Sequence, residues 1–230
     1  MRICTTGGIV HDNESDIRRG PTVCGETRSC VRFVRFVLYP HGLRAYFLGS
    51  PLLRSGLRVL DAGCGTGIVT LALRTALLNR GFPAGRLQGF DLTPAMLERF
   101  RQTLQARAIA DVDLLQADVL RLDALPGSWN NYDLIVSASM LEYLPRNRLV
   151  EALAGLRALL NKEGSFLLFM TRRNWLMRPL IGRWWKANLY TAAELRESFH
   201  RAGFSSVAFR RFPLRFRHLA LWGHIVEAHR

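Results

Sequence analysis

The feature that most constrains this chain is a glycine-rich turn between a short apolar segment and a helix-like one. Leu57–Asp61 reads as a buried strand, and three glycines follow at alternate positions, Gly63, Gly65 and Gly67. Over the next segment, Thr66–Arg80, apolar residues recur at helical spacing. Glycines allow a sharp turn and let a ligand approach the main chain, as in nucleotide-binding loops. The sequence therefore predicts a strand, a ligand-binding turn and a helix here; the alternative interpretation is a plain tight turn.

The remainder of the chain alternates strand-like and helix-like segments. Four further strands are expected at Arg86–Asp91, Val112–Asp118, Tyr132–Ala138 and Ser165–Thr171, and further helices at Thr93–Arg107, Arg146–Leu160 and Thr191–Gly203. Such alternation implies crossover connections and an α/β fold with a doubly wound, mostly parallel sheet. Two closing strands, near Ser206–Phe212 and His218–Glu227, are joined by a short link without helical character. We expect this last pair to form an antiparallel hairpin.

Three aspartates end or follow the first three predicted strands. Asp61 stands just before the glycine turn, Asp91 ends the second strand, and Asp118 ends the third. Ligands bind beyond the carboxyl ends of parallel strands, so these acids are expected on one rim. A carboxylate at Asp61 disfavours a pyrophosphate and suits a ligand with an amine, whereas Asp91 is placed to reach ribose hydroxyls. An ordinary turn-forming role is the alternative for Asp118.

Residues 57–171 resemble the class I S-adenosylmethionine-dependent methyltransferases. The resemblance rests on VLDAGCGTG (59–67), GFD (89–91), QADV (116–119) and YDLIVSASMLEYLP (132–145). It implies a methyltransferase enzyme of the small-molecule branch, similar to the ubiquinone and menaquinone methyltransferases, with S-adenosyl-L-methionine as cofactor. It also implies a seven-stranded Rossmann-like sheet of order 3-2-1-4-5-7-6 with the last strand antiparallel, in agreement with the expected hairpin.

The resemblance also implies which residues contact the methionine end of the cofactor. The turn glycines, with Cys64 among them, would admit the methionine moiety, and Asp61 would orient its amino group. Ser137 and Ser139, just past the fourth strand, would lie near the sulfonium. Arg44 lies at a distance before the turn similar to that of an arginine that pairs with the methionine carboxylate in ubiquinone-type O-methyltransferases; a solvated cation is the alternative.

The adenosine end is assigned in the same way. Asp91 would bind the ribose hydroxyls, with Leu92 against the adenine face. Asp118 would accept a hydrogen bond from the adenine amine, and the Val119 amide would meet a ring nitrogen. These assignments follow from the resemblance and apply residue by residue to the matching motifs.

Methyl transfer from a sulfonium needs mainly alignment and exclusion of water, and a general base only for a poor nucleophile. His41, Glu142 and Tyr143 are the candidate bases, although none has a partner that the sequence reveals. The segment after the fourth strand lacks the Asn/Asp-Pro-Pro-aromatic loop of adenine and cytosine amino-methyltransferases. The paired glutamates of protein-arginine methyltransferases and a cysteine placed to attack a pyrimidine are also missing, which leaves small-molecule acceptors.

The composition is strongly basic, with 32 Lys and Arg against 18 Asp and Glu and a net charge of +14. Such a surplus favours an anionic partner, although a GC-rich coding sequence also produces arginine bias. The four cysteines show no CxxC spacing, so neither a zinc site nor a disulfide framework is expected, and no metal is predicted. Without an apolar leader or a run of about 20 apolar residues, the chain is expected to be cytoplasmic.

Residues 1–30 are expected to form a flexible tail and 31–230 a single methyltransferase domain, with an N-terminal helical cap at 31–56 and a break at Pro40. An insertion at 172–190, on the substrate side, interleaves five cations with three tryptophans. Its interleaving suits a membrane interface or stacking on nucleobases, and a packed lid is the equal alternative.

These features favour a small, apolar or amphiphilic acceptor, with membrane association through the cap and insertion. The alternatives are an RNA methyltransferase, for which no separate RNA-binding module is visible, and a cofactor-binding protein without turnover. The protein is expected to be a monomer or a dimer.

Overall fold

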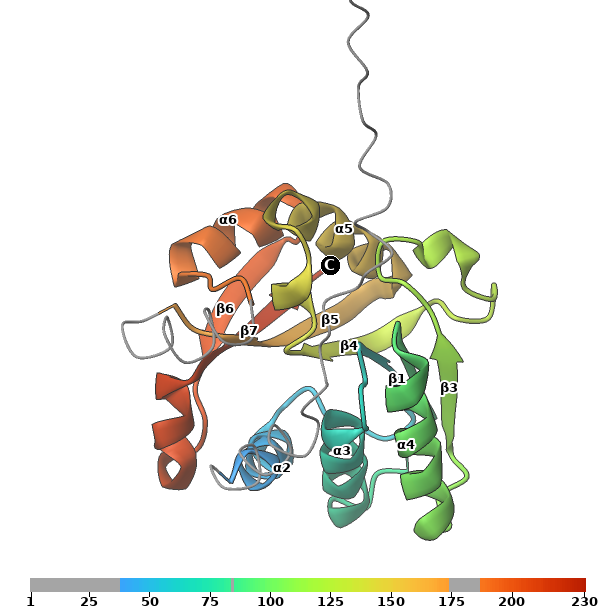
Figure 1. Cartoon of the computed structure of the whole chain (residues 1–230). Helices are drawn as coiled ribbons and strands as arrows, with labels where there is room; N and C mark the ends of the chain where they lie inside the picture. The colour runs from blue at the N-terminus through green and yellow to red at the C-terminus, as the bar shows by residue number, and fades with distance from the viewer. Residues whose placement is uncertain (1–37, 84, 174–186) are drawn as a thin grey trace, which may run out of the picture.

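The computed structural model describes residues 38–83, 85–173 and 187–230, which form one seven-stranded sheet covered by helices on both faces (Figure 1). The sheet order is β3-β2-β1-β4-β5-β7-β6. The strands are β1 (Arg58–Ala62), β2 (Arg86–Asp91), β3 (Val112–Gln116), β4 (Tyr132–Ala138), β5 (Leu160–Thr171), β6 (Ser206–Arg210) and β7 (Gly223–His229). β1 to β5 pair in parallel, and β7 is antiparallel to both of its neighbours. The expected fold class and strand order are confirmed.

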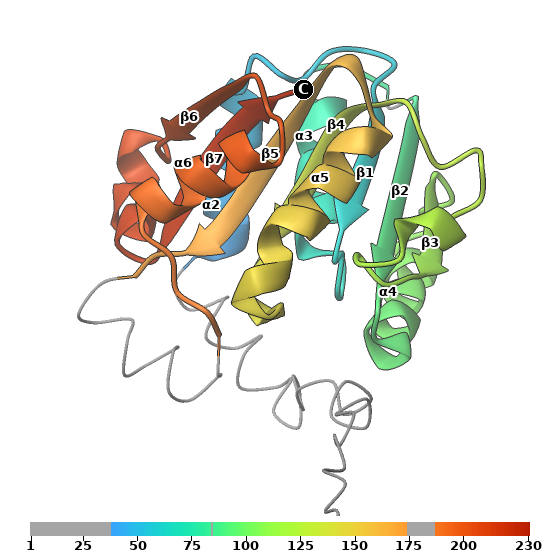
Figure 2. The same ribbon diagram turned by 90° about the horizontal axis from the view of Figure 1, so that it is seen from above.

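Helices cover the two faces of the sheet unequally. On one face lie α2 (Tyr39–Gly49), α3 (Ile68–Asn79) and α4 (Pro94–Ala106), and on the other α5 (Leu149–Leu159) and α6 (Ala192–Arg201) (Figure 2). Short 3₁₀-helices are η1 (Leu122–Ala124), η2 (Leu141–Tyr143), η3 (Arg146–Arg148) and η5 (Leu214–Leu221). Neighbouring residues of β5 serve the two layers alternately, with Phe166 in the α5–α6 core and Leu167 in the α2–α3 core. The central strands are therefore apolar on both sides.

The fifth strand begins earlier than the sequence predicts, at Leu160 instead of Ser165. Leu160 pairs with Tyr132 of β4 before the register shifts, and the Asn161 side chain donates to Asp133 at 2.9 Å. A Cβ on Gly164 would lie 2.7 Å from the Tyr132 carbonyl oxygen. Contacts with β4 thus bring residues 160–164 into the sheet.

The sequence predicted a link without helical character between the two closing strands. The link instead contains η5. Leu219 of η5 is buried against α2, and a Cβ on Gly42 would lie 2.2 Å from its Cδ1. The antiparallel pairing of β6 with β7 is nevertheless confirmed.

Three helix starts show how local sequence acts. Pro40 stands in the first turn of α2, where a missing N–H costs nothing, whereas residues 31–37, before the predicted break, lie outside the described residues. A capping box starts α6, with the Thr191 hydroxyl accepting from the Glu194 amide and the Glu194 carboxylate accepting from the Thr191 amide. At α4, by contrast, the Thr93 hydroxyl does not cap the helix.

Parts of several sequence-based expectations lie outside the described residues. These are the predicted tail at 1–30, residues 31–37 of the predicted cap and residues 174–186 of the predicted insertion. Within the described ranges, none of the helices combines the length and apolarity needed to cross a bilayer.

Candidate cofactor site

Asp61 lies near the carboxyl end of β1 and is only 2% exposed. Its Oδ2 accepts a hydrogen bond of 2.5 Å from the Thr70 hydroxyl of α3. Its Oδ1 is buried and has no hydrogen-bond partner among the described residues. Burial raises the pKa of Asp61 to about 7, against the effect of the Thr70 hydrogen bonds. A buried carboxylate with one unsatisfied oxygen is suited to a ligand that brings a cationic N–H donor.

The three turn glycines have different reasons to be glycine, although all three have positive φ, of 77°, 52° and 85° in chain order. A Cβ on Gly63 would lie 2.4 Å from Met140, and a Cβ on Gly67 would lie 2.1 Å from the Phe100 ring. A Cβ on Gly65 would meet nothing within 4 Å. Gly63 and Gly67 therefore admit protein side chains, and Gly65 alone faces open space where a ligand could approach the main chain.

Asp91, at the end of β2, ties the turn to the next helix. Its Oδ2 accepts from the Gly65 amide at 2.9 Å and its Oδ1 from the Thr93 amide at 2.8 Å. Each carboxylate oxygen has a second lone pair, so the side chain can still accept from ribose hydroxyls. Leu92 follows and is 57% exposed, so its contact with adenine stays a prediction.

Asp118 follows β3 on the same edge of the sheet. Its Oδ1 accepts from the Leu120 amide at 2.9 Å, which forms the local turn that the alternative interpretation proposed. Within the described residues its Oδ2 makes no hydrogen bond and remains able to accept one. The Val119 side chain is buried in the α5–α6 core, so only its backbone is suited to a polar ligand contact.

Three other residues were expected to contact the cofactor: Cys64 and Ser137 are buried, and Ser139 has a positive φ. Cys64 is buried against Leu97 and Phe100, and burial raises the pKa of its thiol. Ser137 is fully buried and donates to the Ala62 carbonyl at 2.8 Å, so its hydroxyl is used within the sheet. Ser139 is exposed and has φ 53°, an unfavourable conformation for a residue with a side chain. It lies directly after β4, beside the turn.

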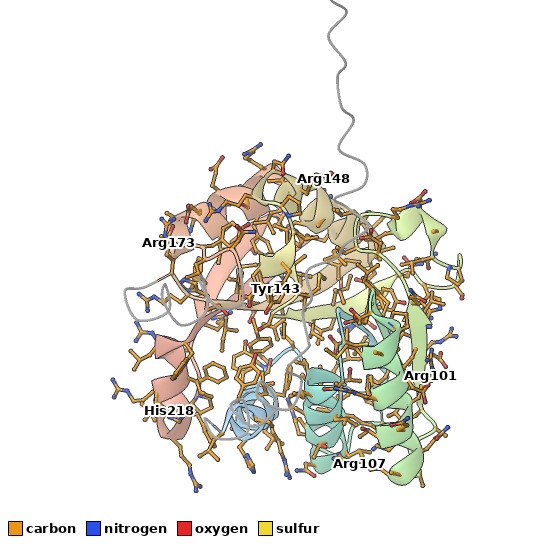
Figure 3. The ribbon with its side chains drawn as sticks, viewed as in Figure 1. Arg101, Arg107, Tyr143, Arg148, Arg173 and His218 are labelled. Carbon is orange, nitrogen blue, oxygen red and sulfur yellow. The ribbon has the colours of Figure 1, made fainter. Side chains whose placement is uncertain are left out.

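Of the three candidate bases, only Glu142 is buried. It is 1% exposed, and its carboxylate accepts from the Thr171 amide at 2.8 Å and hydroxyl at 3.0 Å. Burial raises the pKa of Glu142 to about 7, opposed by these hydrogen bonds. Tyr143, labelled in Figure 3, packs with Ala187 and Leu189. His41 is exposed on α2.

The first residue of α2, Tyr39, was missed by sequence reasoning. Burial raises the pKa of Tyr39, and the charges of Glu142 and Asp61 raise it further. Arg44, the residue expected to reach the cofactor, is exposed, whereas the buried face of the helix is formed by Gly42, Leu43, Tyr46 and Phe47. Only the position of Tyr39 just before Pro40, at a predicted break, could have drawn attention to it.

No group of three or more metal-ligating side chains is found among residues 38–83, 85–173 and 187–230. The polar atoms described above are carboxylate oxygens, hydroxyls and backbone amides from β1, β2, β3 and the turn. They suit a ligand with an amine, a diol and a heteroaromatic ring.

Comparison with known proteins agrees with this geometry. Residues 59–164 match the family profile described as a methyltransferase domain. Malonyl-[acyl-carrier protein] O-methyltransferase from Paenibacillus sp. (strain JDR-2) is 34% identical over 114 residues, 50% of this chain and 38% of that protein. Trans-aconitate 2-methyltransferase from Escherichia coli (strain 55989) is 34% identical over 118 residues, 51% of this chain and 40% of that protein. The chain thus spans about two fifths of the length of these relatives.

A solved structure extends the comparison to the fold. Magnesium protoporphyrin IX methyltransferase from Synechocystis PCC 6803, with bound SAM, superposes with a TM-score of 0.61 over 95% of this chain and 92% of that one, at 19% identity. That identity supports a common fold. Residues 59–164 are thus similar to a methyltransferase domain, and the chain has the sheet order and fold of a class I S-adenosylmethionine-dependent methyltransferase.

Proposed function

We propose that this chain transfers a methyl group from S-adenosylmethionine to a small, apolar or amphiphilic acceptor by in-line displacement. The observation that carries the proposal is the buried Asp61 oxygen without a partner, next to a turn that is open at Gly65. A carboxylate in that place would repel a pyrophosphate and attract an ammonium group. The cofactor of this family has an ammonium group there, so the residues present fit it.

The chain's own residues would bind and align. Asp61 would hold the amino group, the Gly65 segment would approach the methionine moiety, and Asp91 would accept from the ribose. Leu92 would cover the adenine ring and Asp118 would accept from its amine. When bound, the cofactor supplies a methyl group already activated on a sulfonium, so the protein contributes alignment and exclusion of water.

The class of acceptor is inferred from the surroundings of Glu142 and Tyr39. Tyr39 and Tyr46 pack edge-on against Phe212, and Tyr46 and Phe47 pack edge-on against Phe169 at the end of β5. Tyr39, whose pKa is raised by burial and by the charges of Glu142 and Asp61, belongs to this aromatic cluster. Such a setting suits an acceptor with an apolar body and one polar reacting atom, for example a quinone precursor.

The acceptors of the similar proteins support a small-molecule acceptor for this chain. They act on malonyl-acyl carrier protein and trans-aconitate, and the structural neighbour acts on magnesium protoporphyrin IX. These acceptors differ from one another, so they support the class and not a particular substrate.

Glu142 is the residue we propose for accepting a proton from the acceptor. With a pKa of about 7 it is partly ionised at neutral pH, where a general base works best. Glu142→Gln should lower kcat by roughly 100-fold or more for an acceptor that loses a proton. It should leave the affinity for S-adenosylhomocysteine unchanged, and an equal kcat in both proteins would exclude this role.

Calorimetry with S-adenosylhomocysteine and with NAD tests the cofactor, and turnover of labelled S-adenosylmethionine with a panel of quinone precursors, lipids and polar metabolites tests the acceptor. We expect binding of S-adenosylhomocysteine, none of NAD, and transfer to apolar members of the panel. Tight NAD binding would overturn the proposal. Binding without transfer to any acceptor would indicate a cofactor-binding protein without turnover. Transfer to RNA that is weakened steeply by salt would indicate an RNA methyltransferase.

A further inference from the structure

Exposed leucines and arginines gather on one surface that the proposed reaction does not use. Of the six large hydrophobic side chains that are exposed in the described residues, four come from the start and outer face of α2 or from η5: Leu38, Leu48, Leu214 and Leu221. Leu214 is 83% exposed and Leu221 is 61% exposed. Single exposed leucines are ordinary, but a group of them on adjoining elements marks an interaction surface.

The two elements lie side by side. Gly42 of α2 is in such close contact with Leu219 of η5 that a Cβ there would clash, and Phe212 packs against Tyr39 and Tyr46. Figure 1 shows η5 next to α2, on the same side of the sheet. We define the α2–η5 surface by eight exposed residues, from α2, from η5 and from the position before Phe212: His41, Arg44, Leu48, Arg211, Leu214, Arg215, Arg217 and Leu221.

The charge of this surface has one sign. Residues 198–226 contain five arginines and no aspartate or glutamate, and residues 38–60 also lack both acids. Arg44, Arg211, Arg215 and Arg217 are exposed and form no ion pair within the described part of the chain. An acid-free cationic surface is complementary to an anionic one.

We propose that the α2–η5 surface docks the protein on an anionic lipid bilayer. The exposed leucines would enter the headgroup region while the arginines meet the lipid phosphates, as in interfacial amphipathic segments. A nucleic acid is a poorer fit, because the aromatic residues of η5 and its flank that would stack on bases are turned inward: Phe212 is buried and Phe216 is partly buried in the α2–α3 core.

The surface adjoins the proposed acceptor site. Phe212 lies between η5 and the aromatic cluster that reaches Tyr39 and Phe169. An amphiphilic acceptor held in a bilayer would thus be close to the buried carboxylates. Docking is nevertheless independent of the proposed function, since it is measured without turnover.

Co-sedimentation with vesicles of phosphatidylglycerol in phosphatidylcholine, against phosphatidylcholine alone, tests the proposal. The full chain should bind only the anionic vesicles, and high salt should release it. Each cation near an anionic membrane contributes about five-fold in affinity, so Arg215→Gln/Arg217→Gln should weaken binding by about 25-fold. Leu214→Ser should weaken it too, without changing the salt dependence.

The matched control is Arg99→Gln/Arg107→Gln, which removes two exposed arginines, in α4 and at its C-cap, that form no ion pair among the described residues. Figure 3 shows Arg107 at the end of α4, on the opposite side of the helical layer from His218 of η5. This control should bind vesicles like the wild type. All variants should retain the wild-type Tm and affinity for S-adenosylhomocysteine, which shows that they are folded.

Three results would overturn the proposal. One is the absence of binding to anionic vesicles at low salt. Another is an equal loss of binding in the α4 control, which would show a response to net charge alone. The third is tighter binding of a single-stranded RNA that is unaffected by Leu214→Ser, which would assign the surface to nucleic acid. Loss of S-adenosylhomocysteine binding by the wild type would count against the proposed function and leave the docking result untouched.

Discussion

At the scale of single residues, the glycine turn and Asp61 determine what the site can bind. Asp61 keeps one oxygen buried and unpaired, whereas Asp91 uses both oxygens on backbone amides. The turn glycines also differ in their surroundings. Gly63 and Gly67 make room for the side chains of Met140 and Phe100, and of the three only Gly65 faces open space. The motif predicts the turn, but which glycine serves packing and which serves a ligand depends on residues far away in the chain.

Asp61→Asn should weaken the binding of S-adenosylhomocysteine by roughly 10- to 100-fold, because a charge-assisted hydrogen bond is replaced by a neutral one. Affinity of the wild type should rise about ten-fold per pH unit toward pH 7, where Asp61 ionises, and then level off. The variant should lack this rise. Calorimetry between pH 5.5 and 8 measures both, about one unit either side of that pKa. The exposed Asp123 offers the matched control, and a pH dependence that survives in Asp61→Asn would contradict the role.

Gly65→Ala and Gly67→Ala should separate binding from stability. At Gly65 the added methyl meets nothing, so the strain of a positive φ should cost only about 1 kcal/mol while the methyl blocks the ligand. At Gly67 the methyl meets the Phe100 ring, and overpacking should add about 1–3 kcal/mol to that strain. Urea unfolding with ligand titration tests this. Equal stabilities of the two variants would show that the Phe100 contact is not limiting.

At the scale of elements, local signals predicted where helices begin more reliably than where strands begin. The capping box of α6 can be recognised in the sequence because Thr191 and Glu194 are only three positions apart. The early start of β5 was not, because it depends on Tyr132 and Asp133 of another strand. The link at η5 was likewise missed, since Leu219 is buried only by its contact with α2.

Thr191→Ala should destabilise the protein by about 1 kcal/mol, because the first turn of α6 loses its side-chain acceptor. Glu194, the other half of the box, also bridges Arg146 and Arg173, so its substitution would change several contacts at once. Thr103→Ala in α4, where the hydroxyl only bonds its own helix, is the control and should stay within about 0.5 kcal/mol of the wild type. Urea unfolding of both measures the difference, and equal losses would show that the cap contributes nothing.

At the scale of the whole molecule, the sheet brings together carboxylates that are distant in sequence. Asp61 comes from β1 and Glu142 from η2 after β4, and the charges of both raise the pKa of Tyr39. Burial raises the pKa of each acid to about 7, so the fold holds two carboxyl groups that titrate near neutrality.

The stability of the ligand-free protein should therefore depend on pH. A carboxyl group whose folded pKa is raised binds more protons when folded, so its contribution is present below its unfolded pKa of about 4 and is lost as pH rises to about 7. His224, whose pKa is lowered by burial and by Arg172, acts in the opposite direction below pH 6.5.

The difference between wild type and Asp61→Asn isolates the aspartate. Their free energies of unfolding should diverge by on the order of 2–3 kcal/mol between pH 5 and pH 7.5, the wild type losing stability relative to the variant as pH rises. Chemical denaturation across this range provides the measurement. Parallel curves would mean that Asp61 is already ionised in the folded protein at pH 5.

The sequence by itself determined the alternation of strands and helices, the glycine turn and the three strand-end aspartates, because each depends on residues close together in the chain. The tertiary structure alone decided that Asp61 keeps an unpaired oxygen, that Ser137 is used within the sheet, and that Arg44 lies on the exposed face of α2. The physical reason is that burial and hydrogen-bond satisfaction are set by neighbours from other elements. A local pattern can place a side chain on an element, but it cannot say what will surround it.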